Sequence, residues 1–242
     1  MKGTTSVTAS MNFSVREFRH IVGRYLHAHG CRPHLANPLR EVLLSAQASG
    51  FDALTGIESS SAAIAGFTGG LTLVDTEVLD AAGQPAYAVA PDLVDRLLVA
   101  AHAAGRPVTM TVRNLVGAEA LGHLGDYAAV RGLALTVLDA AGSEARVSAV
   151  LAPAAGAPAD PRDAEGARMT AALTAGFDAD VDQFWRLFHE SNGALTPDSE
   201  LSRQHAGAQV RDAEGNVIGE VDEESYLYIR SQAEQLAEVT AR

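Results

Sequence analysis

Apolar residues recur with a helical period in the first part of the chain. Ser14 and Glu17 form an S-x-x-E capping box, which favours a helix that begins here. Apolar side chains then follow on one helical face over residues 18–26. A second helix is predicted with Asn37 as its N-cap and Pro38 in its first turn. Together these segments predict a helical hairpin.

The period then changes from 3.6 to 2, which indicates strands. Residues 71–79 and 108–112 alternate between apolar and polar side chains. The D-A-A-G sequence at 80–83 is a predicted turn, and A-Y-A-V-A at 86–90 is the predicted return strand. Asp92 is expected to cap a helix that leads to the strand at 108–112.

A second part of the chain repeats this pattern. Residues 132–142 resemble residues 70–83, and D-A-A-G again leads to a predicted returning strand, at 146–151. Such a repeat is typical of a duplicated β-hairpin. D-A-x-G is also a common turn in an alanine-rich chain, so duplication and coincidence both stay open.

A further helix is predicted near residue 185. Its apolar side chains lie at positions i, i+3, i+4 and i+7, namely Val181, Phe184, Trp185 and Phe188. Trp185 is expected in the core, and Asp178 or Asp180 can cap the helix. The opposite face is expected to be solvated and carries Asp182, Gln183, Arg186 and Glu190.

A second, polar helix is predicted after Asn192 ends the first. Thr196 is a suitable N-cap, and Pro197 suits the first helical position. Between residues 198 and 205 the only large apolar residue is Leu201. A helix this polar lies on the surface or lines a wet cavity, and both interpretations stay open.

These elements predict an α+β fold. It has an N-terminal helical hairpin, a central antiparallel or mixed β-sheet, and a helical C-terminal part that includes a hairpin over residues 208–221. One compact domain is expected overall. Its expected parts are a disordered tail at 1–11, a helical region at 12–66, a sheet region at 67–151, a Pro/Ala linker or loop at 152–162, and C-terminal helices with the hairpin at 163–242.

Charge and cysteine content narrow the classes of partner. The 242 residues carry a formal net charge of −12, which disfavours nucleic acid and anionic membranes because like charges repel. No apolar run is long enough for a membrane span, and residues 1–11 lack the apolar stretch of a secretory signal. Cys31 is the only cysteine, so no intramolecular disulfide is expected. The expected location is the cytoplasm, and the arginine- and alanine-rich composition indicates a bacterial source.

The stretch at 185–209 concentrates the candidate functional residues. Arg203 is suited to a two-pronged contact with a carboxylate, and a histidine or glutamate can supply the general acid or base. The candidate catalytic residues are His189, Glu200 and His205. The candidate substrate-binding residues are Asn192, Ser199, Ser202 and Arg203.

Metal and cofactor sites have weaker support. The sequence H-A-H-G-C-R-P-H places His27, His29, Cys31 and His34 close together, as a metal site would. Its glycine and proline are also typical of an ordinary turn between two helices. We predict that these residues form no required metal site. No G-x-G-x-x-G sequence follows a predicted strand, so no nicotinamide or other cofactor is expected.

Two resemblances add expectations. E-L-S-R (residues 200–203), followed by A-G-A (206–208), resembles the C-terminal E-x-S-R motif of an uncharacterised bacterial family. That resemblance implies Gly207 as a further site candidate beside the E-x-S-R residues. The helices through residue 51 are more weakly similar to malate/L-lactate dehydrogenases without a Rossmann fold. Those enzymes carry S-H-G where this chain reads G-F-D-A-L-T-G (50–56), without histidine.

Three functional hypotheses follow. The first is a small soluble enzyme that acts on a polar, carboxylate-bearing metabolite by non-redox acid–base chemistry, as a lyase, isomerase or hydrolase. The second is a non-catalytic accessory or ligand-binding protein, either as a homo-oligomer or with a protein partner. The third is a diverged relative of the non-Rossmann dehydrogenases. A catalytic site would need His189 or His205 within reach of Glu200 or Arg203.

Overall fold

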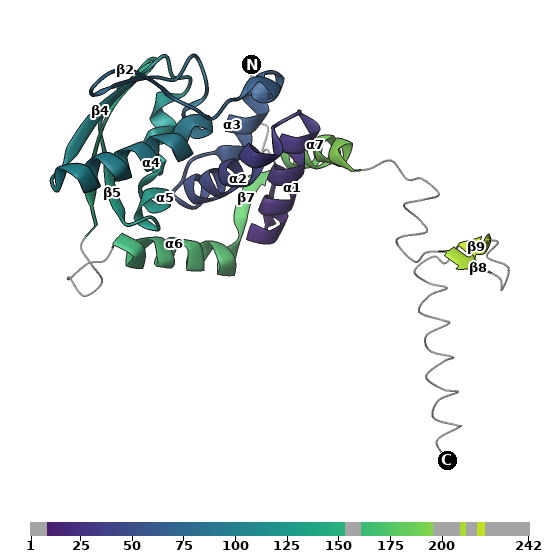
Figure 1. The fold of residues 1–242 in the computed structure, drawn as a ribbon. Coiled ribbons are helices and arrows are strands. Elements are labelled where there is room, and N and C mark those ends of the chain that lie inside the picture. Colours follow the sequence, from purple (N-terminus) through teal and green to yellow (C-terminus); the bar gives the residue numbers. More distant parts are fainter. Residues whose placement is uncertain (1–8, 153–160, 196–208, 212–216, 221–242) are drawn as a thin grey trace, which may run out of the picture. The chain divides into compact units, whose positions relative to one another are not determined.

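The computed structural model describes residues 9–152, 161–195, 209–211 and 217–220 (Figure 1). The chain divides into two units, Met1–Ala194 and Leu195–Arg242, and each is described by itself. The first unit combines helices with a five-stranded sheet, so the predicted α+β fold class is confirmed.

Three helices begin the first unit: α1 (Val15–Ala28), α2 (Pro33–Ala48) and α3 (Ala53–Ser59), followed by the 3-10 helix η1 (Ser61–Gly66). The predicted capping box of α1 is confirmed. The Ser14 backbone N–H donates to Glu17 Oε2 at 2.7 Å, and the Glu17 N–H donates to Ser14 Oγ at 3.2 Å. Phe13 stacks on Phe18 in front of this cap. The helices pack along one apolar core that includes Tyr25, Leu39 and Ile57.

Helix α2 begins earlier than predicted. Its first residue is Pro33 rather than Pro38, and Pro38 lies inside the helix. Proline fits the first position because its N–H is not needed there, whereas an internal proline removes one helical hydrogen bond. Burial of the helix face after Pro38 offsets that loss, through Leu39, Val42 and Leu43.

The sheet of the first unit is mixed, with the strand order β2-β3-β4-β6-β5. Only β3 and β4 are parallel, and helix α4 (Ala86–Ala104) forms the crossover between them. Helix α4, the 3-10 helix η2 (Ala118–His123) and α5 (Gly125–Ala129) contact the sheet (Figure 1). The strand bounds are β2 (Thr72–Asp75), β3 (Val78–Asp80), β4 (Val108–Arg113), β5 (Leu133–Ala141) and β6 (Glu144–Leu151).

The predicted return strand at 86–90 is wrong, because A-Y-A-V-A forms the first turns of α4. All five of these residues are buried, and a short run that is apolar on every side carries no period that separates strand from helix. The two D-A-A-G sequences therefore differ in role. The one at 139–142 connects β5 to β6, whereas the one at 80–83 leads from β3 to α4.

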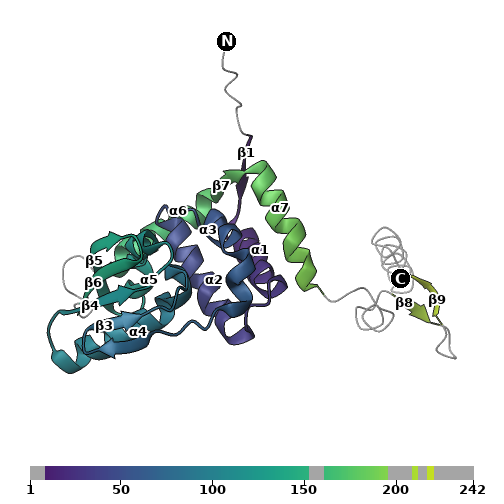
Figure 2. The ribbon, with the colours of Figure 1, turned by 90° about the horizontal axis from the view of Figure 1, so that it is seen from above.

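The chain then returns to the N-terminal helices. Helix α6 (Pro161–Ala175) precedes strand β7 (Phe177–Asp180), which pairs antiparallel with β1 (Ser10–Phe13). Ser10 and Met11, expected in the N-terminal tail, belong to this strand. Helix α7 (Val181–Ser191) follows and packs on α1, and the 3-10 helix η3 (Asn192–Ala194) ends the unit (Figure 2). Asp180 caps α7, one of the two caps predicted.

Trp185 differs from its prediction as a core residue. Its side chain is 45% exposed, while Phe184 and Leu187 beside it are buried. Helix α7 turns Leu187, rather than Trp185, towards the interior, because the buried stripe is centred between positions 184 and 187.

In the second unit, β8 (Gln209–Arg211) and β9 (Val217–Glu220) form an antiparallel pair. The hairpin predicted over 208–221 is therefore confirmed for its two strands. Among the helices that the structure describes, none has the length and apolar content required to cross a membrane.

Candidate functional site

A polar cavity of about 680 Å³ lies between the α2–α3 corner and the start of α7. Asp52, at the start of α3, lines one side of the cavity. Asp180 and Gln183, at the start of α7, line the other. Both helices begin here because each has an aspartate N-cap: Asp52 accepts from the Thr55 N–H at 3.0 Å, and Asp180 accepts from the Gln183 N–H at 2.8 Å. The remaining polar lining comes from Ser10, Gln47, Thr55, Asp178 and Arg186.

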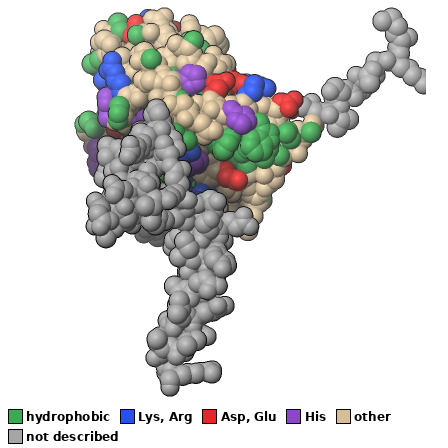
Figure 3. Space-filling model, turned by 90° about the vertical axis from the view of Figure 1, so that its right-hand side faces the viewer, with side chains coloured by type: hydrophobic (Ala, Val, Ile, Leu, Met, Phe, Trp, Pro, Cys, Tyr) green, Lys and Arg blue, Asp and Glu red, His purple; other side chains and the backbone are tan. Residues whose placement is uncertain are grey.

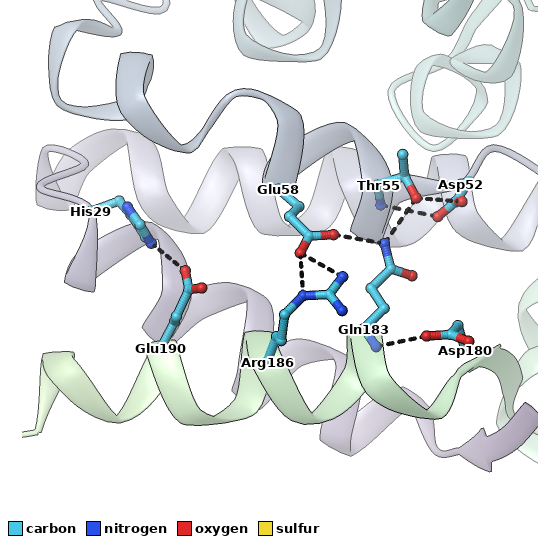
Figure 4. A network of polar contacts seen from close by, with 8 residues as sticks. All are labelled: His29, Asp52, Thr55, Glu58, Asp180, Gln183, Arg186 and Glu190. Carbon is cyan, nitrogen blue, oxygen red and sulfur yellow. Dashed lines mark hydrogen bonds and ion pairs between the residues drawn. The ribbon is translucent and has the colours of Figure 1, made fainter. Parts of the chain in front are cut away.

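A continuous chain of polar contacts joins α3 to α7 along the cavity (Figure 4). The Thr55 hydroxyl donates to Asp52 at 2.7 Å and accepts from the Gln183 side-chain amide at 2.8 Å. The same amide donates to Glu58 at 3.1 Å, and Arg186 donates to the other Glu58 oxygen at 2.9 Å. Glu58 therefore holds two α7 side chains in place from one position on α3.

The charges around this cavity favour some ligands over others. Three carboxylates (Asp52, Asp178 and Asp180) and one guanidinium (Arg186) give the lining a formal charge of −2. Arg186 is already paired with Glu58, and the hydrogen bond to this carboxylate raises the pKa of Arg186 above its usual value. Carboxylate oxygens accept hydrogen bonds from hydroxyl and ammonium groups and repel anions. The lining thus suits a neutral or cationic ligand better than a carboxylate.

Two tyrosines, Tyr25 of α1 and Tyr87 of α4, are buried in the core of the first unit. The hydroxyls of Tyr25 and Tyr87 have no hydrogen-bond partner in the part of the chain that the structure describes. Burial raises the pKa of each to about 12, and the charge of Glu190 adds to the rise at Tyr25. Ser61 lies beside Tyr25, and Ser60 beside Tyr87, without good hydrogen-bond geometry.

The structure places two of the seven predicted site residues. His189 is exposed on α7, with its ring centre 5.9 Å from that of Trp185. Asn192 begins η3, and neither residue lines the polar cavity. The other predicted residues lie outside the described residues: Ser199, Glu200, Ser202, Arg203 and His205. The same holds for Gly207.

The histidine-rich turn separates its side chains. His29 Nε2 lies 3.2 Å from Glu190 on α7, and Cys31 is buried, which raises the pKa of its thiol. His27 and His34 are exposed. Across residues 9–152 and 161–195, no three His, Cys, Asp or Glu side chains come together as a metal site would require.

The sequence does not reveal the positions of Gln183 and Arg186 in the fold. Both were expected to face solvent, but they contact α3 and line the cavity. The available signal was an amide and a guanidinium one turn apart on a polar helix face, close to a predicted aspartate cap. That signal identifies a polar face, but it cannot identify the element opposite.

No family model and no curated protein match the sequence. Among solved structures, the chain is similar to one titled "The crystal structure of dehydrogenase from Sinorhizobium meliloti". The two share 13% sequence identity with a TM-score of 0.55, and the alignment covers 76% of this chain and 100% of the other. At this identity the similarity shows a shared fold alone.

Proposed function

We propose that this protein binds a small polar metabolite with hydroxyl or amino groups in the cavity between α3 and α7. The supporting observation is the cavity lining, in which three carboxylates and two side-chain amides border a space of about 680 Å³. A volume of this size is typical of small-molecule sites. A carboxylate-bearing substrate, expected from Arg203, has less support, because the lining carries net negative charge and Arg203 lies outside the described residues.

Non-redox acid–base chemistry is the class of reaction that we propose at this cavity. A carboxylate can accept a proton from a bound hydroxyl or ammonium group and return it to a neighbouring atom. Asp52 and Asp180 each use one oxygen to cap a helix through a backbone N–H, and each carboxylate can still accept further bonds. Gln183, fixed by Thr55 and Glu58, is placed to orient the ligand.

The test measures binding of matched probes by titration calorimetry. Ethanolamine and glycerol represent amino and hydroxyl ligands, and acetate represents an anion. We expect ethanolamine and glycerol to bind more tightly than acetate, and Asp180→Asn to weaken ethanolamine binding. Asparagine preserves the N-cap, so this substitution removes charge without removing the helix cap.

Asp182→Asn is the matched control, because Asp182 lies on the same helix and does not line the cavity. Equal affinities for all three probes, or equal losses in the two variants, would refute the proposed site. Once a ligand is found, turnover of that ligand separates an enzyme from a binding protein.

A dehydrogenase is the second candidate function, and the fold similarity to the Sinorhizobium meliloti protein is what favours it. It requires a nicotinamide or another redox cofactor. Titration with NADH and NADPH separates the candidates, since micromolar binding would favour a dehydrogenase over the non-redox proposal. We expect no binding, because the chain has neither a G-x-G-x-x-G sequence after a strand nor a histidine within residues 50–56.

A further inference from the structure

A second, smaller cavity lies on the other side of α7. It measures about 280 Å³ and is formed by β1, α1 and α7. Its walls are aromatic and aliphatic: Met11, Ile21, Phe184, Trp185 and Phe188. A cluster of hydrophobic side chains is visible on this side of the molecule, with histidine and carboxylate side chains near its border (Figure 3).

Trp185 lies at this cavity and is exposed, although Phe184 beside it is buried. Its ring meets those of Phe184 and Phe188 edge to face, at 5.7 and 5.4 Å between ring centres. These contacts fix the indole at the cavity edge, with 45% of the side chain still in water. Apolar area of this kind gains free energy when a ligand covers it.

Among the described residues that line this cavity, Glu17 is the only one with a carboxylate, and His20 is the other polar residue. The Ser14 backbone N–H and hydroxyl both donate to one Glu17 oxygen, which lowers the pKa of Glu17 and keeps it ionised. No described residue donates a hydrogen bond to the second oxygen, which can therefore accept one from a ligand. A fixed negative charge thus lies beside an aromatic wall, on a chain whose net charge is −12.

We propose that this cavity binds a small organic cation with an apolar ring. The ring would fill the space between Ile21 and Phe188, while its ammonium group would lie between Glu17 and the indole of Trp185. Indole faces attract cations, and the contact strengthens where water is excluded. A carboxylate ligand is disfavoured by Glu17, and a ligand without a ring would leave the aromatic wall exposed. This inference is independent of the polar cavity on the other side of α7.

The single tryptophan reports directly on this cavity. The experiment titrates the full chain with benzylamine and follows Trp185 fluorescence. Benzyl alcohol is the uncharged probe of the same shape, benzoate is the anionic one, and N-acetyltryptophanamide controls for quenching in solution. We expect a saturable fluorescence change with benzylamine and an affinity about fivefold lower for benzyl alcohol, because a partly exposed charge contact contributes about that much to binding. Benzoate should give no saturable change.

Two variants locate the binding site. Glu17→Gln keeps the capping box, since glutamine serves in it as well as glutamate, but it removes the charge. It should weaken benzylamine about fivefold and leave benzyl alcohol unchanged. Asp180→Asn, in the polar cavity, should leave the fluorescence titration unchanged. The inference is overturned by a non-saturable response, by equal affinities for benzylamine and benzyl alcohol, or by a loss that follows Asp180→Asn instead of Glu17→Gln.

Discussion

Two arginine–carboxylate pairs connect helices α6 and α7 to the rest of the first unit, and their carboxylates differ in burial. Arg168 of α6 pairs with Asp126 of α5, whose side chain is only 8% exposed. Arg186 of α7 pairs with Glu58 of α3, which is 29% exposed. Asp126 also accepts from the Ser49 hydroxyl at 3.1 Å, and this bond ties α2 to the same carboxylate.

The difference separates a buried junction from one whose carboxylate is accessible to solvent. At the α5–α6 junction the carboxylate is buried and both of its oxygens are bonded within the protein. At the α3–α7 junction the same chemistry lies beside the polar cavity, where Gln183 and Arg186 also face its space. Buried pairs are costly to break because they leave an unpaired charge, whereas exposed pairs contribute little.

The largest effect is expected at Gly176, which links α6 to β7 and therefore joins the two junctions. Its φ is +73°, and an added Cβ would lie 2.6 Å from the Phe13 carbonyl oxygen. Gly176→Ala should destabilise the protein by about 3–4 kcal/mol, from left-handed strain plus the backbone clash. Gly142→Ala is the control, because its φ is +60° and its Cβ would meet open space. Urea unfolding that gives equal losses would contradict the clash.

Arg168→Ala tests the buried junction itself. The substitution leaves Asp126 buried without its cation, and we expect a loss of about 2–3 kcal/mol, below the full cost of breaking a buried pair because Arg168 is half exposed. Asp126→Asn should cost less, since it leaves an exposed guanidinium and keeps an acceptor for Ser49. Chemical denaturation of both variants measures the order. A larger loss in Asp126→Asn than in Arg168→Ala would contradict this account, because an unpaired buried carboxylate would then not be the main cost at this junction.

Glu58→Gln tests the accessible junction and should cost only about 0.5–1 kcal/mol. It removes the charge that pairs with Arg186 while keeping an acceptor for Gln183. Arg186 is then unpaired beside the cavity, so ethanolamine should bind more weakly and acetate more tightly. Calorimetry with both probes checks this, and Glu41→Gln, on α2 outside the cavity, is the control. A stability loss as large as that of Arg168→Ala would contradict the distinction between the junctions.

The sequence predicts the helices and strands of the fold better than it predicts which of them pack together. Capping residues are local, so Ser14 and Asp180 identify helix starts correctly. The predicted caps Asn37 and Asp92 are wrong, because they lie inside α2 and α4. Alternation and turn residues likewise predict the β5–β6 hairpin. The prediction fails at A-Y-A-V-A, where burial on all sides removes the periodic signal.

The candidate site depends on contacts between distant segments, which sequence alone does not provide. Gln183 meets Thr55 across 128 residues of chain, and His29 meets Glu190 across 161. Each of these residues is unremarkable in its own helix. The pairing of β1 with β7 and the packing of α7 on α1 and α3 bring them together.

The smallest effect at neutral pH is expected from Tyr25→Phe. The Tyr25 hydroxyl is buried without a partner among the described residues, so its removal should change stability by less than about 1 kcal/mol at pH 7. At alkaline pH we expect a larger effect on stability, because the folded-state pKa of Tyr25, about 12, lies above the usual value of 10.0. The neutral phenol therefore favours the folded state below pH 10, and this contribution is lost as pH rises through about 12. The variant should retain more stability than the wild type between these values. Urea unfolding at pH 7 and pH 11 measures the difference, and identical pH dependence of the two proteins would show that Tyr25 ionises freely in the folded state.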